Sequence, residues 1–457
     1  MSTSTRRVAV VGGGIAGLAA ARALASAEGA PEVVLLESDD RVGGKLLTTP
    51  FAGRAAIDEG PDAFLARLPW GTALAKAVGL GDELVSPAAG KAAVWWEQLH
   101  DIPQGLLLGM PTDVMALARS KLLSWPGKLR AAMEPFRPRT STSPDSLGGY
   151  VRDRFGNEVH LRLVDPLVGS IYAADTDHFS LAAVPQIADL AGKARSILVA
   201  GRKMPKPSPT AGPVFYAPSG GMGDLAARTA AAATAAGVQI RLGTTAQELV
   251  ADGHGWRVDG ERFDAVVLAC PAKHSSRLLG DLAPDASRAL FAIPAADVAM
   301  VTLSVPSADW PERLRALSGY LVPKPMQRLV TATSFGSQKW THWADADSVL
   351  LRISLGRDGL PVLHLSDDTL LTAAVEEVSH HIGHQLQPTA QRITRWTGAF
   401  PQYRPHHADN VAGIEAQLPA GITLAGASFH GIGVPACINS AQKAAAATTA
   451  FLQSLAQ

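Results

Sequence analysis

Three glycines near the amino terminus have the spacing of a turn that binds phosphate. Gly12, Gly14 and Gly17 form a G-x-G-x-x-G pattern between a short apolar run at 8–11 and an alanine-rich segment that favours a helix. In such a unit the first glycine permits a tight turn, the second lets a pyrophosphate approach the backbone, and the third lets the helix pack on the strand. The pyrophosphate then lies at the positive end of the helix. The pattern predicts a dinucleotide-binding turn.

An acidic residue follows at the spacing that suits the ribose of a bound dinucleotide. A second apolar run, at 33–36, ends at Glu37, where a carboxylate can accept hydrogen bonds from the ribose hydroxyls. An acid at this point disfavours a 2′-phosphate. The alternative is a structural glycine turn followed by an ordinary surface glutamate. Because strand, turn, helix, strand and acid occur in the expected order, we favour the dinucleotide site.

The segment after Glu37 distinguishes between dinucleotides. It contains Arg41, a glycine pair at Gly43 and Gly44, and Lys45, so that backbone and cations can wrap the far side of a pyrophosphate. Two incidental cations in a glycine-rich loop are the alternative. The arginine-x-glycine-glycine motif resembles that of the flavin amine oxidase and phytoene desaturase superfamily, and the resemblance extends over most of the chain. It implies FAD and not NAD.

Composition limits the classes of function. The chain of 457 residues has 41 basic and 41 acidic side chains, so its charge gives no argument for a nucleic-acid partner. Cys270 and Cys437 lie far apart without C-x-x-C spacing and are expected to stay reduced thiols, as in a cytoplasmic protein. The spacing of the histidines, cysteines and acids matches no metal-binding motif.

The sequence also gives no sign of a targeting or membrane segment. No room for a secretory signal precedes the first strand, and no apolar run reaches eighteen residues, so we expect a soluble protein without a transmembrane segment.

The pattern along the chain predicts a fold of the α/β and α+β classes in three regions. A Rossmann-type FAD-binding domain, like that of p-hydroxybenzoate hydroxylase and the amine oxidases, would comprise 1–72, 215–274 and 415–457. A mixed-sheet substrate domain would comprise 73–103 and 275–414. An inserted helical subdomain would occupy 104–214 and include a basic helix from Met115 to Met133. That helix could contact anionic lipid, although a solvated face is the simpler interpretation.

Four segments carry a narrower resemblance. The sequences at 91–103 (KAAVWWEQLHDIP), 216–225, 395–403 (RWTGAFPQY) and 431–440 (GIGVPACINS) are similar to those of the protoporphyrinogen and coproporphyrinogen oxidase family. The G-x-G-V-P-x-C-I run at the carboxyl end is more specific than the glycine turn. The soluble bacterial type implies a six-electron oxidation of coproporphyrinogen III to coproporphyrin III in heme biosynthesis. Dioxygen would be the acceptor, hydrogen peroxide would form, and the product would pass to a downstream ferrochelatase.

Several alternatives stay open at this point. Protoporphyrinogen IX is the main alternative substrate. A flavin amine oxidase would need an aromatic cage beside the flavin, for which Tyr403, Trp396 and Phe429 are the candidates. A carotenoid desaturase would share the amino-terminal motif but differ at the carboxyl end. A flavoprotein without enzymatic activity is the remaining class.

The resemblance also implies particular site residues. Flavin N5 would accept the hydride, and no side chain is assigned as a catalytic acid or base. The implied contacts of a non-covalent FAD are Gly12, Gly13, Gly14, Ile15, Ala16, Gly17, Glu37, Ser38, Arg41, Gly44, Lys45, Gly60, Pro61, Asp62, Ala63, Ala246, Trp396, Ile432, Gly433 and Val434. The carboxyl-terminal helix would direct its amino terminus at the flavin pyrimidine.

For the substrate, Lys91 falls where the family has a cation for a propionate, and Tyr320 and Leu321 fall in the apolar walls around the macrocycle. Arg352 is a further candidate for a carboxylate. One departure concerns the P-Q-Y motif, which the family usually follows with a glycine and a histidine. Here Pro401-Gln402-Tyr403 leads to Arg404-Pro405-His406-His407, which puts the conformation of this loop in doubt.

Overall fold

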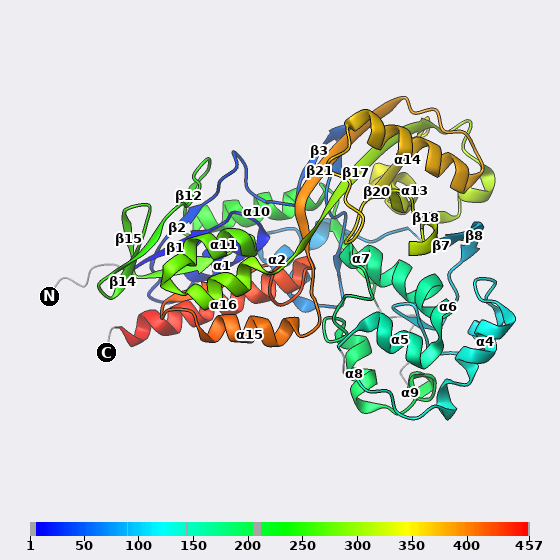
Figure 1. The fold of residues 1–457 in the computed structure, drawn as a ribbon. Helices are drawn as coiled ribbons and strands as arrows, with labels where there is room; N and C mark the ends of the chain where they lie inside the picture. Colours follow the sequence, from blue (N-terminus) through cyan, green and yellow to red (C-terminus); the bar gives the residue numbers. More distant parts are fainter. Residues whose placement is uncertain (1–5, 89, 143–144, 204–211, 456–457) are drawn as a thin grey trace. The chain divides into compact units, whose positions relative to one another are not determined.

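The computed structural model describes residues 6–88, 90–142, 145–203 and 212–455, and the chain divides into two compact units. Unit 1 consists of Met1–Ser86, Gly212–Pro294 and Ala408–Gln457, and unit 2 consists of Pro87–Ala211 and Ala295–His407. Figure 1 shows the elements of both units. Both the helical region and the substrate region predicted from the sequence fall largely within unit 2. The division into compact units therefore does not distinguish these two regions from each other.

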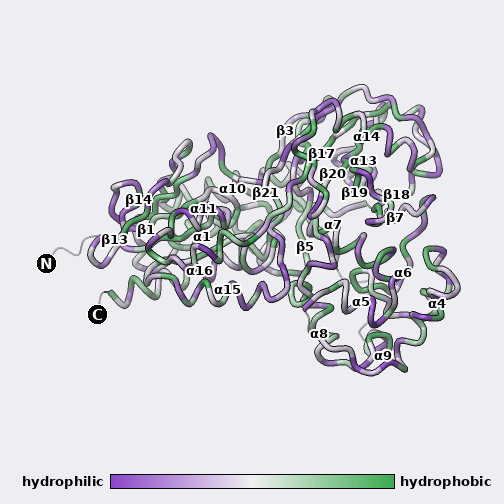
Figure 2. Tube along the Cα trace, in the orientation of Figure 1, coloured by the Kyte–Doolittle hydropathy of each residue, from purple (hydrophilic) through white to green (hydrophobic). Residues whose placement is uncertain are grey.

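Unit 1 is built on a five-stranded parallel sheet. Its order is β12 (Gln239–Arg241), β2 (Glu32–Leu36), β1 (Arg7–Val11), β16 (Ala265–Leu268) and β22 (Ile422–Leu424). The central strands are hydrophobic almost throughout (Figure 2), as expected for parallel strands that are covered on both faces. The helices that pack on this sheet or on one another are α1 (Ile15–Ala25), α10 (Met222–Ala235) and α16 (Val434–Ser454). All five strands lie within the segments that the sequence assigned to the Rossmann-type domain, and the predicted fold class is confirmed.

Smaller elements complete unit 1. They are the hairpin β3–β4 (Thr48–Phe51, Arg54–Asp58), the sheet β5–β11–β6 (Phe64–Leu65, Phe215–Pro218, Leu84–Val85), the meander β13–β15 (Leu249–Asp252, Gly255–Val258, Glu261–Phe263), and the helices α2 (Pro69–Ala77), α11 (Ala272–Leu279), α12 (Pro284–Phe291) and α15 (His407–Ala416). The hydrophobic cluster around Trp256 and Phe263 joins the meander to the central sheet.

Unit 2 contains a mixed seven-stranded sheet. Its order is β21 (Ala390–Pro401), β17 (Ala295–Pro306), β20 (Ser348–Leu355), β19 (Val330–Phe335), β18 (Leu317–Leu321), β7 (Lys91–Trp96) and β8 (Gln98–Asp101). All neighbours are antiparallel except β18 and β7. Helix α14 (Asp367–Ile382) covers one face, where Leu370, Ala374 and Val378 join the core. We call the opposite face of this sheet the helical-side face.

The rest of unit 2 is mainly helical. Its helices are α3 (Val114–Arg119), α4 (Trp125–Ala132), α5 (Leu147–Phe155), α6 (Asn157–Val159), a π-helix (His160–Gly169), α7 (Ser170–Tyr172), α8 (Pro185–Lys193) and α9 (Ile197–Lys203), with α13 (Gly336–Lys339) beside the sheet. Among the helices of the described ranges, none is both long and apolar enough to cross a membrane.

The predicted single helix from Met115 to Met133 is wrong, because the structure contains two helices separated at 120–124. The Ser120 hydroxyl accepts a hydrogen bond from the backbone N–H of Leu122 (3.2 Å), which competes with helical hydrogen bonding. Ser124 then caps the second helix by accepting from the N–H of Gly127 (3.1 Å). The apolar and basic pattern continues across this break, which is why periodicity alone did not reveal it.

Candidate cofactor site and substrate face

The glycine turn lies between the end of β1 and the start of α1, and its geometry explains each glycine. Gly12 has a φ of +108°, and a Cβ there would lie 2.9 Å from the carbonyl oxygen of Ala269. A Cβ on Gly17 would lie 1.8 Å from the carbonyl oxygen of Gly12, so only glycine lets α1 approach the turn. By contrast, a Cβ on Gly14 would meet no described atom within 4 Å, so this backbone faces open space that a pyrophosphate can approach.

The amino terminus of α1 offers its backbone N–H groups to an anion. Gly14 is the N-cap residue, and among the described side chains none caps the helix and no acid lies in its first turn. Ile15 and Ala16 are buried in that first turn. The first N–H groups of a helix have no partner within the helix, and the helix dipole adds positive potential there. The arrangement fits a pyrophosphate.

Glu37 is held against this turn. Its Oε2 accepts from the backbone N–H of Gly13 (2.5 Å), and its Oε1 accepts from the N–H of Asp39 (2.9 Å) and the hydroxyl of Ser38 (3.1 Å). The carboxylate therefore keeps one orientation at the end of β2. This position beside the turn is the one that a ribose-binding acid requires.

The second loop packs directly on the first. The N–H of Gly43 donates to the carbonyl of Gly13 (2.8 Å), and a Cβ on Gly44 would lie 3.3 Å from the Cα of Gly14. The Arg41 guanidinium donates to the carbonyl oxygens of Gly44 (2.8 Å) and Val42 (3.3 Å). In this structure Arg41 therefore holds its own loop in shape, which is a different role from a direct salt bridge to phosphate.

Lys45 and Cys437 influence each other electrostatically. Surrounding protein atoms lower the pKa of the Lys45 ammonium even though much of its side chain is accessible, and the nearby Cys437 opposes this shift. Burial raises the pKa of the Cys437 thiol to about 11, so this cysteine is a neutral thiol at physiological pH. Cys270 and Cys437 are both free, as the sequence predicted.

The amino terminus of α16, like that of α1, has a glycine as its N-cap residue. Gly433 is the N-cap residue, Pro435 follows in the first turn, and within the described part of the chain no side chain caps the helix and no acid lies in its first turn. Ile432 is half-buried, Gly433 is exposed and Val434 is buried. A helix end of this kind stabilises a negative charge that lies close to its first N–H groups.

The remaining predicted FAD contacts of unit 1 lie in connecting segments. Gly60, Pro61, Asp62 and Ala63 join β4 to β5 and are half-buried or exposed. Ala246 is buried between β12 and β13, and its carbonyl oxygen accepts from Nε2 of His274 (3.0 Å). The carbonyl oxygen keeps a second lone pair, so a backbone contact from Ala246 to a ligand can use its C=O or its N–H.

The strand register separates the substrate candidates of unit 2 into two groups. Successive residues of a strand point to opposite faces of its sheet. Tyr320 pairs with Thr333 and Ala93 on the face that α14 covers, whereas Leu321 pairs with Ala332 and Val94 on the helical-side face. The two neighbours therefore cannot form one wall.

Tyr320 belongs to the core. Only 1% of its surface is exposed, and its hydroxyl is 3.1 Å from Nδ1 of His381 on α14. Burial raises the pKa of Tyr320 above its usual range. As placed here, its ring offers no surface to a substrate, so the predicted role of Tyr320 as a slot wall needs correction.

Lys91 and Arg352 also lie on opposite faces of the sheet. Lys91 is exposed at the start of β7, on the same face as Ala93 and Trp95, which pack in the core beneath α14. Arg352 lies on the helical-side face, but it is only 5% exposed and its guanidinium carbon is 5.6 Å from the ring centre of Trp343. Its position is that of an internal, stacked cation and not of an open rim residue.

Trp396 lies on the helical-side face with Leu321. It pairs with Val298, and both pack in a small cluster with Ala173 of the helical region. At another point of this face the guanidinium of Arg162 lies 4.1 Å above the ring of Trp96. The helical-side face therefore combines apolar and aromatic side chains, as a site for a large apolar ligand requires.

A buried polar network joins the helical region to the sheet, and the sequence did not indicate it. Both carboxylate oxygens of Asp165, in the π-helix, accept from the Arg357 guanidinium (3.0 and 2.8 Å), and the Thr176 hydroxyl donates to the same carboxylate (2.7 Å). Burial alone would raise the pKa of Asp165, but Arg357, helped by the Thr176 hydroxyl and by His160, lowers the pKa below its usual value. The only sequence signal was a single acid in the mostly apolar segment HLRLVDPLVG.

The P-Q-Y loop is ordered by a second ion pair. Arg404 donates to both carboxylate oxygens of Asp358 (2.6 and 2.9 Å), and the Gln402 amide donates to the carbonyl of Tyr172 (3.1 Å).

His406, where the family usually has glycine, has a φ of +65°, in the left-handed region that favours glycine. His407 stacks on Tyr403 with ring centres 3.9 Å apart. The chain keeps the glycine-type backbone without the glycine.

Comparison with known proteins first defines the class. The sequence model of the flavin-containing amine oxidoreductases matches residues 15–449, so the chain belongs to this family. The cyclohexylamine oxidase of Brevibacterium oxydans shares the fold, with a TM-score of 0.70 at 18% identity over 99% of this chain and 100% of its own. The predictions of an oxidoreductase fold and of FAD as the cofactor are confirmed.

More similar proteins narrow the class. The coproporphyrinogen III oxidase of Mycobacterium leprae is 35% identical over 96% of this chain and 98% of its own length. The coproporphyrinogen III oxidase of Bacillus subtilis is 30% identical over 99% and 100% of the two chains. A crystal structure described as a protoporphyrinogen oxidase, from Exiguobacterium, has a TM-score of 0.86 at 31% identity over 98% of this chain and 99% of its own. The predicted porphyrinogen oxidase family is therefore confirmed.

Proposed function

We propose that this chain is an FAD-dependent coproporphyrinogen III oxidase that forms coproporphyrin III in heme biosynthesis. The observation that carries the proposal is similarity over nearly the full length to bacterial proteins of that name, at 30–35% identity. The proposal includes a cytoplasmic location and delivery of the product to a ferrochelatase. A chloroplastic protoporphyrinogen oxidase from rice is 26% identical over 97% of this chain, which makes protoporphyrinogen IX the second candidate.

The reaction removes six electrons and six protons from the macrocycle in three two-electron steps. When bound, FAD supplies the hydride acceptor and passes the electrons to dioxygen, so three molecules of dioxygen become three of hydrogen peroxide. The product is aromatic, which favours each loss of hydrogen without a strong catalytic base. The protein therefore has to bind and orient two large molecules more than it has to transfer protons.

The backbone of unit 1 fits the cofactor. We assign the pyrophosphate to the amino terminus of α1 at Gly14, the ribose hydroxyls to Glu37, and the flavin pyrimidine to the amino terminus of α16 at Gly433. The open space above Gly14 and the uncapped helix ends support these assignments. FAD would be bound without a covalent link, so acid precipitation should release the yellow colour into the supernatant. Colour that stays in the pellet would contradict this assignment.

For the substrate we favour the helical-side face of unit 2. Leu321 and Trp396 lie on this face, and a porphyrinogen has an apolar centre with carboxylates at its rim. Lys91 stays a candidate for a propionate, although its strand register places it on the face of α14. Arg352 would contact substrate only if its stacking on Trp343 were broken.

An amine oxidase activity is less well supported. The candidate cage residues Tyr403 and Phe429 are both buried, and Tyr403 already stacks on His407. An aromatic cage works by presenting exposed ring faces to an amine. Neither ring has such a face in its own unit.

The test compares both porphyrinogens with the FAD-loaded protein under air. We expect growth of porphyrin fluorescence, about three molecules of peroxide per porphyrin from the electron count, and a higher kcat/KM with coproporphyrinogen III. A higher kcat/KM with protoporphyrinogen IX would overturn the substrate assignment. Under argon, either substrate should bleach the flavin absorbance. A flavin that is not bleached would leave a redox-silent flavoprotein as the better description.

A further inference from the structure

The loop that follows α7 forms part of the helical-side face of unit 2. Ala173 packs there with Val298 and Trp396. Ala173 has a φ of +46°, in the left-handed region, and its carbonyl oxygen accepts from the backbone N–H of Asp358 (2.8 Å). A residue other than glycine keeps this conformation where its surroundings enforce it. We call residues 173–177 the wall loop.

Hydrogen bonds tie the wall loop to the π-helix in a fixed direction. The Arg357 guanidinium and the Thr176 hydroxyl both donate to the Asp165 carboxylate, at 2.8 and 2.7 Å. A hydroxyl has a single hydrogen, so Oγ1 of Thr176 must accept from Nε2 of His160, which lies 2.8 Å away. Nε2 of His160 therefore carries the hydrogen, and Nδ1 keeps its lone pair.

The Nδ1 lone pair of His160 faces a cation. The guanidinium of Arg152 on α5 lies 3.1 Å from Nδ1 and also pairs with Asp177 of the wall loop. His160 thus holds the loop at two points, directly at Thr176 and through Arg152 at Asp177. The contact with Arg152 requires a neutral imidazole, because a protonated ring has a second N–H at the place where Arg152 donates.

The imidazole has little room to move. His160 and Thr176 are both fully buried. A Cβ on Gly148 of α5 would lie 2.7 Å from Nε2 of His160, and the N–H of Gly148 donates to the carbonyl of Thr176 (2.8 Å). Helix α5 therefore packs directly on the ring and on the wall loop.

The charges near His160 balance as long as its ring is neutral. Among the described groups, three carboxylates act on the imidazole, and each has its own cation in the pairs Asp177–Arg152, Asp175–Lys324 and Asp165–Arg357. His178 is a further titratable group, but its side chain is 70% exposed and it lies beside Asp175 (3.3 Å). A proton on His160 would add a buried positive charge where every one of these carboxylates is already paired.

Acid acts on this arrangement with a definite sign. Burial lowers the pKa of His160, and Arg152 acts in the same direction, against the three aspartates. The folded wall loop therefore binds fewer protons than a released loop, in which the histidine has its ordinary pKa of about 6.5. The attached loop is favoured at neutral pH and loses stability as the pH falls below about 6.5.

We propose that His160 is a positioning residue for the porphyrinogen, which as a neutral imidazole holds the wall loop against Trp396 and as an imidazolium releases it. Substrate binding then weakens in mild acid, while FAD binding in unit 1 does not change. The inference rests on the proposed function for the identity of the substrate. His160 acts through the loop and contacts neither the substrate nor the flavin.

The first test is the KM of the FAD-loaded protein for coproporphyrinogen III under air as a function of pH. At about pH 5.5 a released histidine is about ten times more often protonated than neutral, so KM should rise by up to about tenfold between about pH 7.5 and 5.5. The kcat and the flavin absorbance should change less than about twofold. A KM that does not rise in acid would overturn the proposal.

Variants at position 160 separate this response from titration of the substrate carboxylates. His160→Gln keeps one donor and one acceptor and cannot be protonated, so its KM should stay near the neutral value across this range. His160→Leu loses both hydrogen bonds and should show a raised KM already at about pH 7.5. An acid rise in KM as steep in His160→Gln as in the unmodified protein would assign the response to another group. His160→Gln decides the question even if His160→Leu does not fold.

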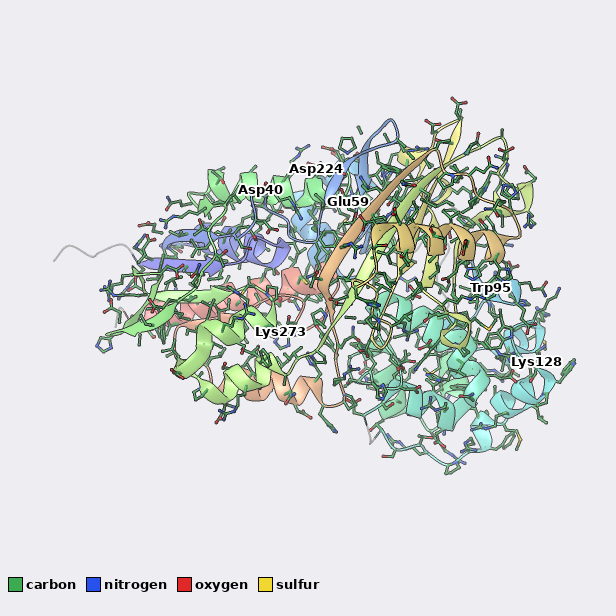
Figure 3. All side chains as sticks on the ribbon, turned by 45° about the horizontal axis from the view of Figure 1, so that its top comes forward. Asp40, Glu59, Trp95, Lys128, Asp224 and Lys273 are labelled. Atoms are coloured by element: carbon green, nitrogen blue, oxygen red, sulfur yellow. The ribbon has the colours of Figure 1, made fainter. Side chains whose placement is uncertain are left out.

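A second buried histidine of unit 2 is the matched control. His381 on α14 is 7% exposed, and its ring centre lies 4.1 Å from that of Trp95, which is labelled in Figure 3. Burial lowers the pKa of His381 to about 4, but α14 lies on the face of the sheet opposite to the wall loop. His381→Gln should therefore keep the acid rise in KM. If His381→Gln abolished this rise as His160→Gln does, the response would not belong to the wall loop and the proposal would be wrong.

Hydrogen exchange tests the wall loop without substrate. After correction for the intrinsic rate, the amides of 173–177 should lose about tenfold of their protection between about pH 7.5 and 5.5 in the unmodified protein and keep it in His160→Gln. Unchanged protection in the unmodified protein would contradict the proposal. If the protein oxidised neither porphyrinogen but released the loop in acid, the proposed function would be wrong and the role of His160 in holding the loop would stand.

Discussion

The candidate sites of the two units are built from different kinds of atoms. In unit 1 the candidate site consists mostly of backbone, namely the turn at Gly12 to Gly17 and the amino termini of α1 and α16. In unit 2 the candidate face consists of side chains, and β7 and β18, which lie side by side in it, are more than 200 residues apart in sequence. A site made of backbone requires glycine at particular positions, so a short stretch of sequence reveals it. A face made of side chains from distant strands has no such motif within any one stretch of sequence.

The largest expected effect concerns the backbone site. Gly17→Ala would place a Cβ 1.8 Å from the Gly12 carbonyl oxygen, so the turn must shift and bound FAD should fall more than about tenfold. The measurement is the ratio of flavin to protein absorbance after gel filtration. Gly413→Ala on α15 is the control, since a Cβ there meets no described atom within 4 Å. If both variants retained FAD, the turn would not be the cofactor site.

The next effect concerns the buried network of unit 2. Arg357→Met leaves the Asp165 carboxylate buried without its cation and should lower the free energy of unfolding by about 3–5 kcal/mol at neutral pH. The depressed pKa of Asp165 means that this stabilisation is present above the pKa of an unfolded aspartate and is lost as pH falls through the folded pKa. Urea titrations at neutral and acid pH should show a difference that shrinks in acid.

The exposed pair Arg288–Asp285 provides the contrast for this measurement. Arg288→Ala removes an ion pair in which both side chains are largely exposed, so the change should stay within about 1 kcal/mol. A loss for Arg357→Met as small as that for Arg288→Ala would show that unit 2 does not depend on the network.

A smaller effect tests which face of the unit 2 sheet meets the substrate. Leu321→Ala should raise KM for the porphyrinogen about fivefold through lost apolar contact, with FAD content unchanged. Lys91→Ala is the companion variant, and the sequence-based prediction gives it a loss of roughly 1–3 kcal/mol of charge-assisted hydrogen bonding. A larger rise in KM for Lys91→Ala than for Leu321→Ala would favour the face of α14 and contradict our assignment.

The smallest effect concerns the P-Q-Y loop. His406 adopts a left-handed backbone, so His406→Gly should relieve strain and raise the unfolding free energy by about 1 kcal/mol. The check is the Tm, which should rise by a few degrees. His364→Gly is the control, because its φ is not positive and the substitution should lower stability slightly. Equal shifts for both variants would exclude strain as the cause.

The sequence predicted most of unit 1 because each element there has a local cause. Apolar runs marked the parallel strands, and glycine spacing marked the turn next to Glu37. In unit 2 the same reasoning failed where tertiary pairing decides the outcome. Tyr320 and Leu321 looked equivalent until the register placed them on opposite faces, and Asp165 gave no sign of its partner Arg357. The break before Trp125 depended on two serine hydroxyls, which periodicity does not detect.

Unit 1 cannot be completed until nearly the whole chain has left the ribosome. Its sheet needs β22 at Ile422–Leu424, and α1 packs against α16, which ends at Ser454. During synthesis β16 (Ala265–Leu268) must therefore keep one edge unpaired while the second segment of unit 2, Ala295–His407, is made. The nascent chain is exposed to aggregation throughout that interval. A premature stop after residue 421 would remove an edge strand and α16 together, and the product would be cleared by proteolysis before it could bind a cofactor.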